Sequence, residues 1–214
     1  MKRTKLQKFT ELKSFDNVLE YTSSAFIKNV EKLLSSNNYI CLELGCGNGD
    51  FSIELAKQNP DKLYIGIDIQ GERLWYGSKR ATAEKITNVF FIRMFIDSID
   101  ELIPTKSINE IWITFPDPYS KKSKANKRLT SQNFLDKYKK ILKQNGVINF
   151  KTDDKDLFEF TIEEAKSCSW TIVELIEDVH NMNTKATSLE IKTKFEQKWI
   201  ELGKKIYYLK FTSV

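Results

Sequence analysis

A carboxylate between two prolines stands directly before a dense run of cations. Phe115-Pro-Asp-Pro-Tyr119 ends an apolar stretch, and five basic residues fall within 121–128. Prolines cannot donate to a sheet ladder and each fixes its own φ angle, so Asp117 is expected on a stiff backbone at the carboxyl end of a strand. A rigid acid beside many cations suits chemistry on one group of a polyanion. A proline turn followed by a solvated charge run is the structural alternative.

A glycine-rich loop gives the second chemical signal. The loop Gly45-Cys-Gly-Asn-Gly49 follows the apolar stretch 39–44 and precedes a helical apolar spacing that ends at 59–60. A strand, a glycine loop and a helix form half of a nucleotide-binding βα unit. Its glycines allow a tight turn and let a ligand approach backbone N–H groups at the start of the helix. The glycines concerned are Gly45, Gly47 and Gly49.

Acidic residues around this loop indicate the charge of its ligand. Asp50 occupies the place where a dinucleotide-binding loop has its third glycine, and Glu43 lies inside the preceding apolar stretch. Both carboxylates disfavour a pyrophosphate and favour the positively charged groups of S-adenosylmethionine. Asp68 ends the next predicted strand, nineteen residues after Gly49, where this architecture hydrogen-bonds a ribose diol. The sequence therefore predicts a site for S-adenosylmethionine.

Positive charge is concentrated in two windows of the chain. Residues 1–13 contain five basic side chains and one acidic one, and residues 121–143 contain nine basic and one acidic, whereas the whole chain has a net charge of +5. Such clustering is typical of a protein that binds a phosphate backbone, and a pair of lysine-rich helical surfaces is the alternative. A nucleic acid is the expected partner.

The remaining composition narrows the class of protein. No apolar run approaches the roughly 18 residues that a membrane span needs, and no apolar stretch of signal-peptide length begins the chain. Three cysteines without metal-ligand spacing predict reduced thiols in a cytoplasmic protein and no metal site. The single histidine disfavours Ser/His and Cys/His catalysis. We expect no membrane partner, and monomer and homodimer both stay open.

The order of the predicted elements gives the fold class. We expect a flexible basic arm over 1–13 and one domain over 14–214, with a polar loop over 178–190. The alternation of βα units predicts a doubly wound α/β fold with a mostly parallel, seven-stranded sheet and one antiparallel strand. The predicted strands are 39–44, 63–68, 89–94, 111–115, 147–150, 171–176 and 205–211, and the predicted helices are 15–34, one ending before 59–60, 73–85, 132–143 with a stop at 145–146, 157–165 and 193–202.

Five motifs follow one another between residues 40 and 211. They are Leu-Glu-Leu-Gly-Cys-Gly-Asn-Gly (42–49), Ile-Gly-Ile-Asp (65–68), Thr-Phe-Pro-Asp-Pro (114–118) with its basic tail, Lys-Thr-Asp (151–153) and Thr-Lys-Phe-Glu (193–196). In these motifs and their order the chain resembles the tRNA (guanine-N7-)-methyltransferases, which have the class I Rossmann-like methyltransferase fold. The resemblance implies methyl transfer from S-adenosylmethionine to N7 of a guanine in the variable loop of tRNA.

The resemblance also implies roles for individual residues. Asp117 would stand at the reacting centre and line the cofactor pocket, together with Glu43, Gly45, Gly47, Gly49, Asp68 and Phe95. The tRNA would be held by Lys121, Asp153, Thr193, Lys194, Phe195 and Glu196. Structural alternatives are a helix cap for Asp153, a polar helix edge for Thr193 and Glu196, and an interchangeable cation for Lys121.

Two positions depart from the pattern of the family. Asp68 stands where many members have glutamate, and this shorter acid can still reach a ribose. Phe95 stands where many members have an aspartate near the adenine, so we expect that contact to come from the backbone or from stacking. Asp97 lies two residues later and is not assigned the role of the missing acid.

The target atom determines the expected chemistry. Guanine N7 has an in-plane lone pair and no proton, so no general base is needed and orientation supplies most of the rate. Asp117 would favour the positive charge that moves onto the purine and accept hydrogen bonds from guanine N1–H and N2–H₂. Two other functions stay open. One is a methyltransferase for exocyclic amino groups. Such enzymes have an Asn/Asp-Pro-Pro-aromatic motif, which Pro-Asp-Pro-Tyr of this chain resembles superficially. The other is a non-catalytic RNA-binding protein on a methyltransferase fold.

Overall fold

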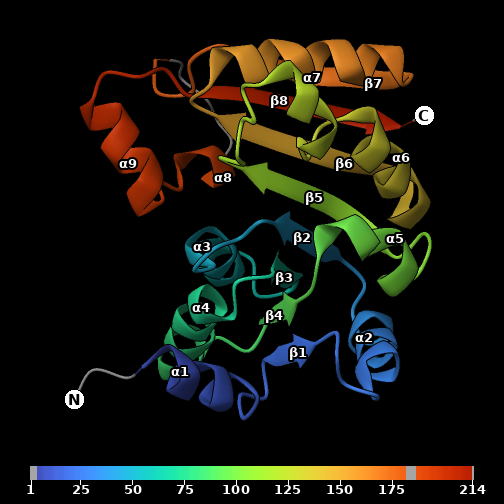
Figure 1. The fold of residues 1–214 in the computed structure, drawn as a ribbon, viewed down its shortest axis with the longest axis vertical. Coiled ribbons are helices and arrows are strands. Elements are labelled where there is room, and N and C mark those ends of the chain that lie inside the picture. The colour runs from blue at the N-terminus through green and yellow to red at the C-terminus, as the bar shows by residue number, and fades with distance from the viewer. Residues whose placement is uncertain (1–3, 182–186, 214) are drawn as a thin grey trace.

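One β-sheet runs through the part of the chain that the computed structural model describes, residues 4–181 and 187–213 (Figure 1). Its eight strands lie in the order β1-β4-β3-β2-β5-β6-β8-β7. β8 is antiparallel to its neighbours β6 and β7, and the other neighbours are parallel. The strands are β1 (Val18–Glu20), β2 (Ile40–Leu44), β3 (Leu63–Asp68), β4 (Val89–Arg93), β5 (Ile108–Thr114), β6 (Leu142–Thr152), β7 (Trp170–Ile176) and β8 (Tyr207–Ser213). The predicted fold class is confirmed, with β1 as an additional edge strand.

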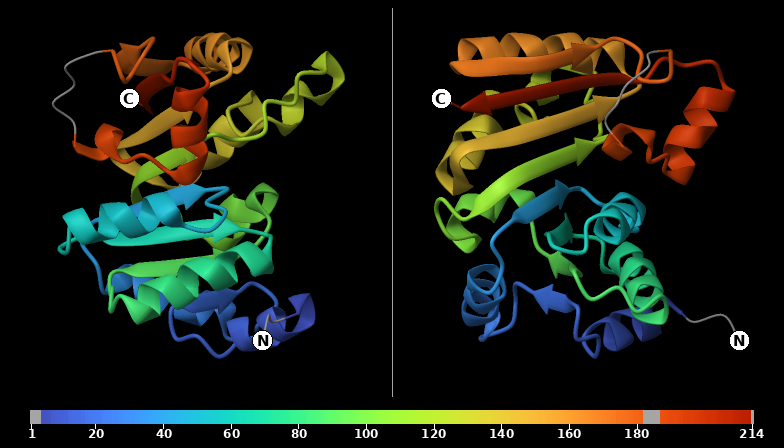
Figure 2. Two further views of the ribbon diagram at one scale, coloured as in Figure 1. Left: turned by 90° about the vertical axis from the view of Figure 1, so that its left-hand side faces the viewer. Right: turned by 180° about the vertical axis from the view of Figure 1, so that it is seen from behind.

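Helices cover both faces of the sheet (Figure 2). One apolar core contains side chains of α2 (Phe26–Ser35), α5 (Ile99–Leu102), α6 (Gln132–Ile141) and α7 (Lys155–Ser167). The other contains side chains of α1 (Lys5–Leu12), α3 (Asp50–Gln58), α4 (Gly71–Ala83), α8 (Thr187–Glu190) and α9 (Lys194–Glu201). Along β2, Leu42 and Leu44 lie in the first core and Cys41 in the second. The alternation of side chains along a strand therefore sends Glu43 toward α3.

The carboxyl ends of β2, β3, β4 and β5 meet at one edge of the sheet. β3 and β4 lie on one side of β2, and β5 lies on the other, so the winding of the chain reverses between β2 and β5. In open α/β sheets this reversal separates the connecting segments and leaves a crevice in which ligands bind. The topology thus defines where a functional site is expected.

Two local predictions were wrong. The predicted helix 15–34 is replaced by β1 and α2, because Val18–Glu20 pairs with β4 and the N–H of Phe91 donates to the carbonyl of Asn17 at 2.8 Å. The predicted helix stop at 145–146 lies inside β6, which begins as soon as α6 ends. In both places pairing with another strand outweighs the local helix signal.

The N-terminal segment is helical, where the sequence predicted a flexible arm. Residues 5–12 form α1, and Leu12 is fully buried. The ammonium group of Lys8 donates to Glu72 Oε1 at 2.6 Å and to the hydroxyl of Tyr76 at 2.7 Å, both on α4. These contacts attach α1 to the domain. Residues 1–3 of the predicted arm and 182–186 of the predicted polar loop lie outside the described residues.

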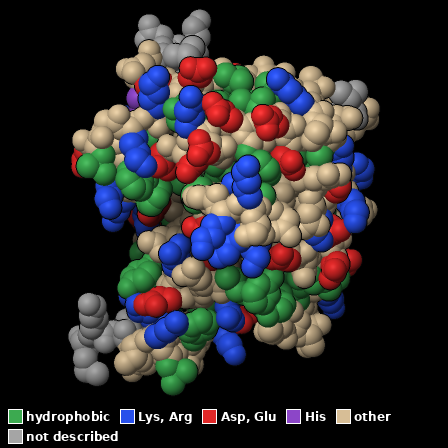
Figure 3. Space-filling model, turned by 45° about the horizontal axis from the view of Figure 1, so that its top comes forward, with side chains coloured by type: hydrophobic (Ala, Val, Ile, Leu, Met, Phe, Trp, Pro, Cys, Tyr) green, Lys and Arg blue, Asp and Glu red, His purple; other side chains and the backbone are tan. Residues whose placement is uncertain are grey.

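Cationic side chains are exposed on a projecting segment. The 3-10 helix η2 (Lys122–Lys127), yellow-green, extends away from the body of the molecule in the left view of Figure 2. Figure 3 shows Lys and Arg side chains gathered near the middle of one face, with acidic side chains around them. None of the described helices is long and apolar enough to cross a membrane.

Candidate active site

A cavity of about 570 Å³ lies at the carboxyl ends of the central strands. Gly45 follows β2, Asp68 ends β3, Phe95 follows β4 and Asp117 follows β5, and all four line this cavity. Its volume falls within the range of small-molecule sites, about 300–1,000 Å³. The fold thus brings together residues that are far apart in the sequence, at the reversal point of the sheet.

The glycine loop is a tight turn fixed against the neighbouring strands. Gly45, Gly47 and Gly49 have φ angles of 73°, 56° and 69°, in the left-handed region that favours glycine. The N–H of Gly45 donates to the carbonyl of Ile67 in β3 at 2.8 Å. A Cβ atom at Gly49 would lie 2.2 Å from the ring of Phe91, so a larger residue does not fit there.

Glu43 lies behind this loop and is satisfied by the chain itself. Its side chain is buried, Oε2 accepts hydrogen bonds from the N–H and hydroxyl of Ser52 at 3.0 and 2.5 Å, and Oε1 accepts one from the hydroxyl of Thr114 at 2.9 Å. Burial raises the pKa of Glu43 to about 7, although these hydrogen bonds oppose the shift. Glu43 is not among the residues that line the cavity. It joins β2, α3 and β5 beneath the loop.

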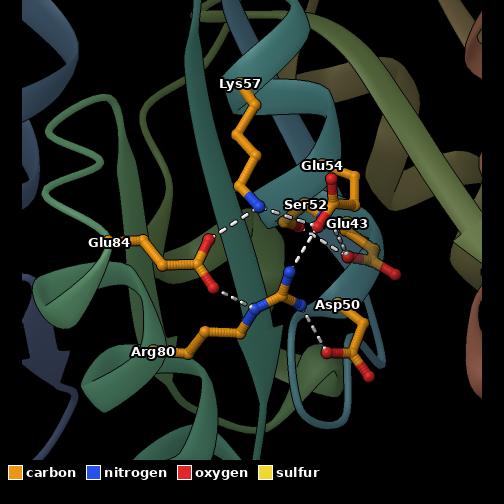
Figure 4. A network of polar contacts seen from close by, with 7 residues as sticks. All are labelled: Glu43, Asp50, Ser52, Glu54, Lys57, Arg80 and Glu84. Atoms are coloured by element: carbon orange, nitrogen blue, oxygen red, sulfur yellow. Dashed lines mark hydrogen bonds and ion pairs between the residues drawn. The ribbon is translucent and has the colours of Figure 1, made fainter.

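Asp50 does not supply the free negative charge that the sequence predicted. Its Oδ1 lies 2.9 Å from Nη1 of Arg80 on α4, in a network that also contains Glu54, Lys57 and Glu84 (Figure 4). Asp50 is also absent from the lining of the cavity. Asp50 is thus held by Arg80, which it shares with Glu54 and Glu84, and lies outside the cavity, so the expectation that Asp50 acts on the ligand is corrected.

Asp68 is held in place at the floor of the cavity. It is 7% exposed, Oδ2 accepts a hydrogen bond from the N–H of Gly47 at 3.0 Å, and Oδ1 accepts one from the N–H of Gln70 at 2.7 Å. A carboxylate oxygen can accept more than one hydrogen bond, so both oxygens retain capacity for a ligand. The contact with Gly47 also couples the acid to the glycine loop.

Asp117 is the exposed acid of the loop that follows β5. The two residues that bracket Pro-Asp-Pro have positive φ angles, 48° at Phe115 and 42° at Tyr119. The N–H of Phe115 donates to the carbonyl of Lys151 at 2.8 Å, which fixes the start of the loop. Within the described residues the carboxylate of Asp117 has neither a hydrogen bond nor an ion pair, so it is available to a ligand.

Further residues line the cavity, and most of them lie outside the motifs. Asp97 lies two residues after Phe95, and the ring of Phe95 is half exposed and packs edge-to-face with that of Tyr21 at a centroid distance of 5.9 Å. Arg73 lies beside Gly47, and Lys127 reaches the cavity from η2. The remaining polar residues that line it and that the sequence did not single out are Gln70, Tyr119, Asn126 and Asn133.

The two residues expected to hold tRNA before α9 differ in exposure, because the side chain of Asp153 is only 14% exposed. Lys121 is exposed directly before η2. Asp153 Oδ2 accepts a hydrogen bond from the ammonium group of Lys204 at 2.6 Å. The cap of α7 is Asp154, which accepts a hydrogen bond from the N–H of Leu157 at 2.7 Å. The structural alternative for Asp153, a helix cap, is therefore wrong.

The four residues expected on α9 have different surroundings. Thr193 caps the helix by accepting a hydrogen bond from the N–H of Glu196 at 3.2 Å. Lys194 is exposed, and the half-exposed ring of Phe195 lies 5.5 Å from the ring of Phe115. Glu196 is fully buried. The structure thus brings Phe195 against Phe115, which lines the cavity, whereas Thr193 caps the helix and Glu196 is buried.

The sheet order, the glycine loop and the acid at the end of β3 together define a class I Rossmann-like methyltransferase. A solved 16S rRNA methyltransferase, KamB, has this fold, with a TM-score of 0.67 over 90% of this chain and 94% of its own, at 15% sequence identity. A family model described as "Putative methyltransferase" matches residues 37–209.

Sequence relatives identify the family. The chain is 38% identical to a tRNA (guanine-N(7)-)-methyltransferase of Christiangramia forsetii, over 98% of this chain and 97% of the relative. It is 37% identical to an enzyme of the same name from Bacteroides fragilis, over 99% of this chain and 86% of the relative. The chain belongs to the tRNA (guanine-N7-)-methyltransferase family.

Proposed function

We propose that this protein transfers a methyl group from S-adenosylmethionine to N7 of a guanine in tRNA, in the variable loop. The observation that carries the proposal is Asp117, a carboxylate without a partner among the described residues, on a proline-bracketed loop between the cavity and a cationic segment. Further support comes from relatives named tRNA (guanine-N(7)-)-methyltransferase that align over almost the whole chain. The buried, free cysteines and the RNA substrate fit a cytoplasmic protein.

The lining of the cavity fits S-adenosylmethionine. Asp68 would accept hydrogen bonds from the ribose hydroxyls, and the glycine loop would let the methionine part approach the backbone. Phe95 offers an exposed ring surface to the adenine, in place of the family's acid. The cavity has both signs of charge, with Asp97 and Asp117 for cationic groups and Arg73 and Lys127 for a carboxylate. A cofactor with a sulfonium, an amino group and a carboxylate matches this mixture.

The residues of the chain would act by orientation and charge. S-adenosylmethionine supplies a methyl group on a sulfonium: the N7 lone pair forms the C–N bond while the C–S bond breaks and its electrons stay on sulfur. No proton leaves N7, so no base is required. Asp117 would accept hydrogen bonds from N1–H and N2–H₂ of the guanine and stabilise the positive charge that develops on the ring. Adenine lacks these donors, so the same contacts would select guanine.

A single experiment separates this reaction from its alternatives. Unmodified tRNA is incubated with the protein and S-adenosylmethionine, and its nucleosides are analysed by mass spectrometry. We expect 7-methylguanosine. A base methylated on an exocyclic amino group would instead support the amino-methyltransferase, and RNA that binds without any methylation would support a non-catalytic RNA-binding protein. Sequencing of the tRNA after cleavage at the methylated guanine then tests whether that guanine lies in the variable loop.

A further inference from the structure

Arg128 ends the basic run, but its surroundings differ from those of the lysines before it. Lys121, Lys122 and Lys124 are exposed, and their side chains form no hydrogen bond or ion pair with the described residues. Arg128 is partly buried and donates from Nε to the carbonyl of Pro118 at 3.0 Å and from Nη2 to the carbonyl of Tyr119 at 3.2 Å. The guanidinium group of Arg128 is thus used within the protein.

A second contact fixes the guanidinium group from its other side. It lies over the ring of Phe160 in α7, with its central carbon 4.3 Å from the ring centroid. An arginine can stack on a ring and present a planar fork of donors at the same time, whereas a lysine has a compact ammonium group and cannot do both. Arg128 therefore connects the loop after β5 to α7.

The loop that Arg128 holds has a backbone that requires support. Positive φ angles are sterically costly for residues with a Cβ atom, and they occur at Phe115 and Tyr119, on both sides of Asp117. Pro116 and Pro118 lack an N–H group and cannot donate a hydrogen bond. Among the described residues, the hydrogen bonds that reach residues 116–120 are the two from Arg128. Phe115 is anchored separately, through the carbonyl of Lys151.

We infer that Arg128 is a positioning residue for methyl transfer: by binding the carbonyls that follow Asp117, it holds that carboxylate in the cavity. The inference rests on the proposed function. Arg128 uses its charge on main-chain carbonyls, so it does not bind a phosphate of the RNA. In this respect it differs from the other cations of the run, with which the sequence groups it.

The test compares Arg128→Gln with Lys122→Gln, which removes the same charge from an exposed position of the same segment. Arg128→Gln is expected to lower the single-turnover rate at saturating tRNA and cofactor by about a hundredfold, the loss associated with a misplacement of about 1 Å. Its Kd for tRNA and the salt dependence of that Kd should equal those of the wild type. Lys122→Gln should weaken tRNA binding and reduce the salt slope by about 0.7–0.9. If Arg128→Gln instead reduces the salt slope and leaves the rate unchanged, Arg128 is a phosphate ligand and the inference is wrong.

A double-mutant cycle distinguishes positioning from an independent structural effect. Because Arg128 acts through Asp117, Arg128→Gln should cost much less in the Asp117→Asn background than in the wild type. Equal losses in both backgrounds would contradict the inference. Arg128→Lys keeps the charge but not the fork, so it should recover only part of the rate.

Hydrogen exchange tests, without RNA or cofactor, whether Arg128 holds the loop after β5. Arg128→Lys is the variant used in this measurement. If Arg128→Gln does not fold, Arg128→Lys also replaces it in the rate and binding measurements. The amides of Lys124 and Arg128, which donate to the carbonyls of Lys121 and Ala125 in the segment that Arg128 holds, should exchange faster in Arg128→Lys than in the wild type, and unchanged exchange would overturn the inference. If the wild type methylates no guanine but exchange is faster in the variant, the proposed function is contradicted. The conclusion that Arg128 holds the loop after β5 would then still stand.

Discussion

Lys151 and Glu196 form an ion pair that is completely removed from solvent. The ammonium nitrogen lies 2.6 Å from Oε1, with the two side chains 0% and 1% exposed. Lys151 belongs to β6, and its carbonyl accepts the hydrogen bond of Phe115 that begins the Asp117 loop. Glu196 belongs to α9, next to Phe195, whose ring contacts Phe115. One lysine thus joins α9 and the Asp117 loop. Burial lowers the pKa of Lys151, and Glu196 opposes this shift.

Removal of one partner of this pair should strongly destabilise the protein. Lys151→Met leaves the buried carboxylate of Glu196 with only its contact to Nε2 of His180 at 2.9 Å, and we expect the free energy of unfolding to fall by about 3–5 kcal/mol. Urea unfolding measures this loss. The exposed pair Lys155–Glu159, with a distance of 3.4 Å, is the control: Lys155→Ala should cost only about 0.5 kcal/mol. Similar losses in both variants would show that the buried pair is not an anchor of α9.

A pH dependence of stability should follow from Glu43. Its pKa is about 7 in the folded state and 4.5 ordinarily, so the folded protein keeps a proton that the unfolded chain releases between these values. The resulting stabilisation is present below about pH 4.5 and is lost as the pH rises through 7. Glu43→Gln cannot titrate. Between pH 5 and pH 8, the stability of the wild type should therefore fall relative to that of the variant, by at most about 3 kcal/mol. Urea unfolding at both pH values checks this, and a constant difference would contradict it.

The positions of two acids of the candidate site were predictable from the sequence, because both acids lie at the ends of strands. Asp68 and Asp117 each follow a short apolar run, and parallel strands bring their carboxyl ends to one edge. The sequence order alone therefore placed both acids together, and the structure agrees. The positive φ angles of the glycine loop were likewise predictable from Gly45, Gly47 and Gly49.

Pairings between distant residues were not predictable. Asp50 and Glu43 flank the same loop, yet Asp50 is paired with Arg80 in α4 and Glu43 faces Ser52. Arg128 looks like its lysine neighbours in sequence, and only the folded loop brings the carbonyls of Pro118 and Tyr119 within its reach. Partners of this kind depend on packing, which local composition does not encode.

Cofactor binding should depend on Asp68 and not on Asp50. Asp68→Ala removes the acid that fixes Gly47 and faces the cavity, so the affinity for S-adenosylhomocysteine should fall about 10- to 100-fold. Asp50→Ala is the matched control, because that acid is paired with Arg80 outside the cavity. Isothermal titration measures both, and NAD should not bind. An equal loss in the two variants, or tight binding of NAD, would contradict the assignment of the cofactor.

Binding of tRNA should depend on the exposed lysines of the basic run. Substitution of Lys121, Lys122 and Lys124 by Gln should reduce the slope of log K against log salt by about 2, because each lost phosphate contact contributes about 0.7–0.9. Lys85→Gln is the control: Lys85 is exposed between α4 and β4, at the opposite edge of the sheet from the cavity. Filter binding over a salt series checks the slopes. A triple variant with the slope of the wild type would place the RNA on another surface.

Substitution of Asp117 by Asn should abolish most of the methyl transfer while the fold stays intact. The prolines on both sides keep the backbone in place, so the amide replaces the carboxylate at the same position and changes only charge and hydrogen-bond polarity. Its oxygen can still accept one hydrogen bond, but its NH₂ group opposes the N1–H and N2–H₂ donors of guanine and the positive charge that develops on the ring. The loss of one such contact costs about 100-fold or more in rate.

A single-turnover assay with labelled cofactor measures this loss, and a melting curve checks the fold of Asp117→Asn. Glu163→Gln is the control, because it removes a carboxylate from an exposed position on α7 and should leave the rate and the melting temperature unchanged. Since Asp117 is exposed, its replacement should not lower the melting temperature either. If Asp117→Asn folds, binds tRNA and S-adenosylhomocysteine, and methylates at the rate of the wild type, the carboxylate has no part in the reaction, and selection of guanine must then come from other residues that line the cavity.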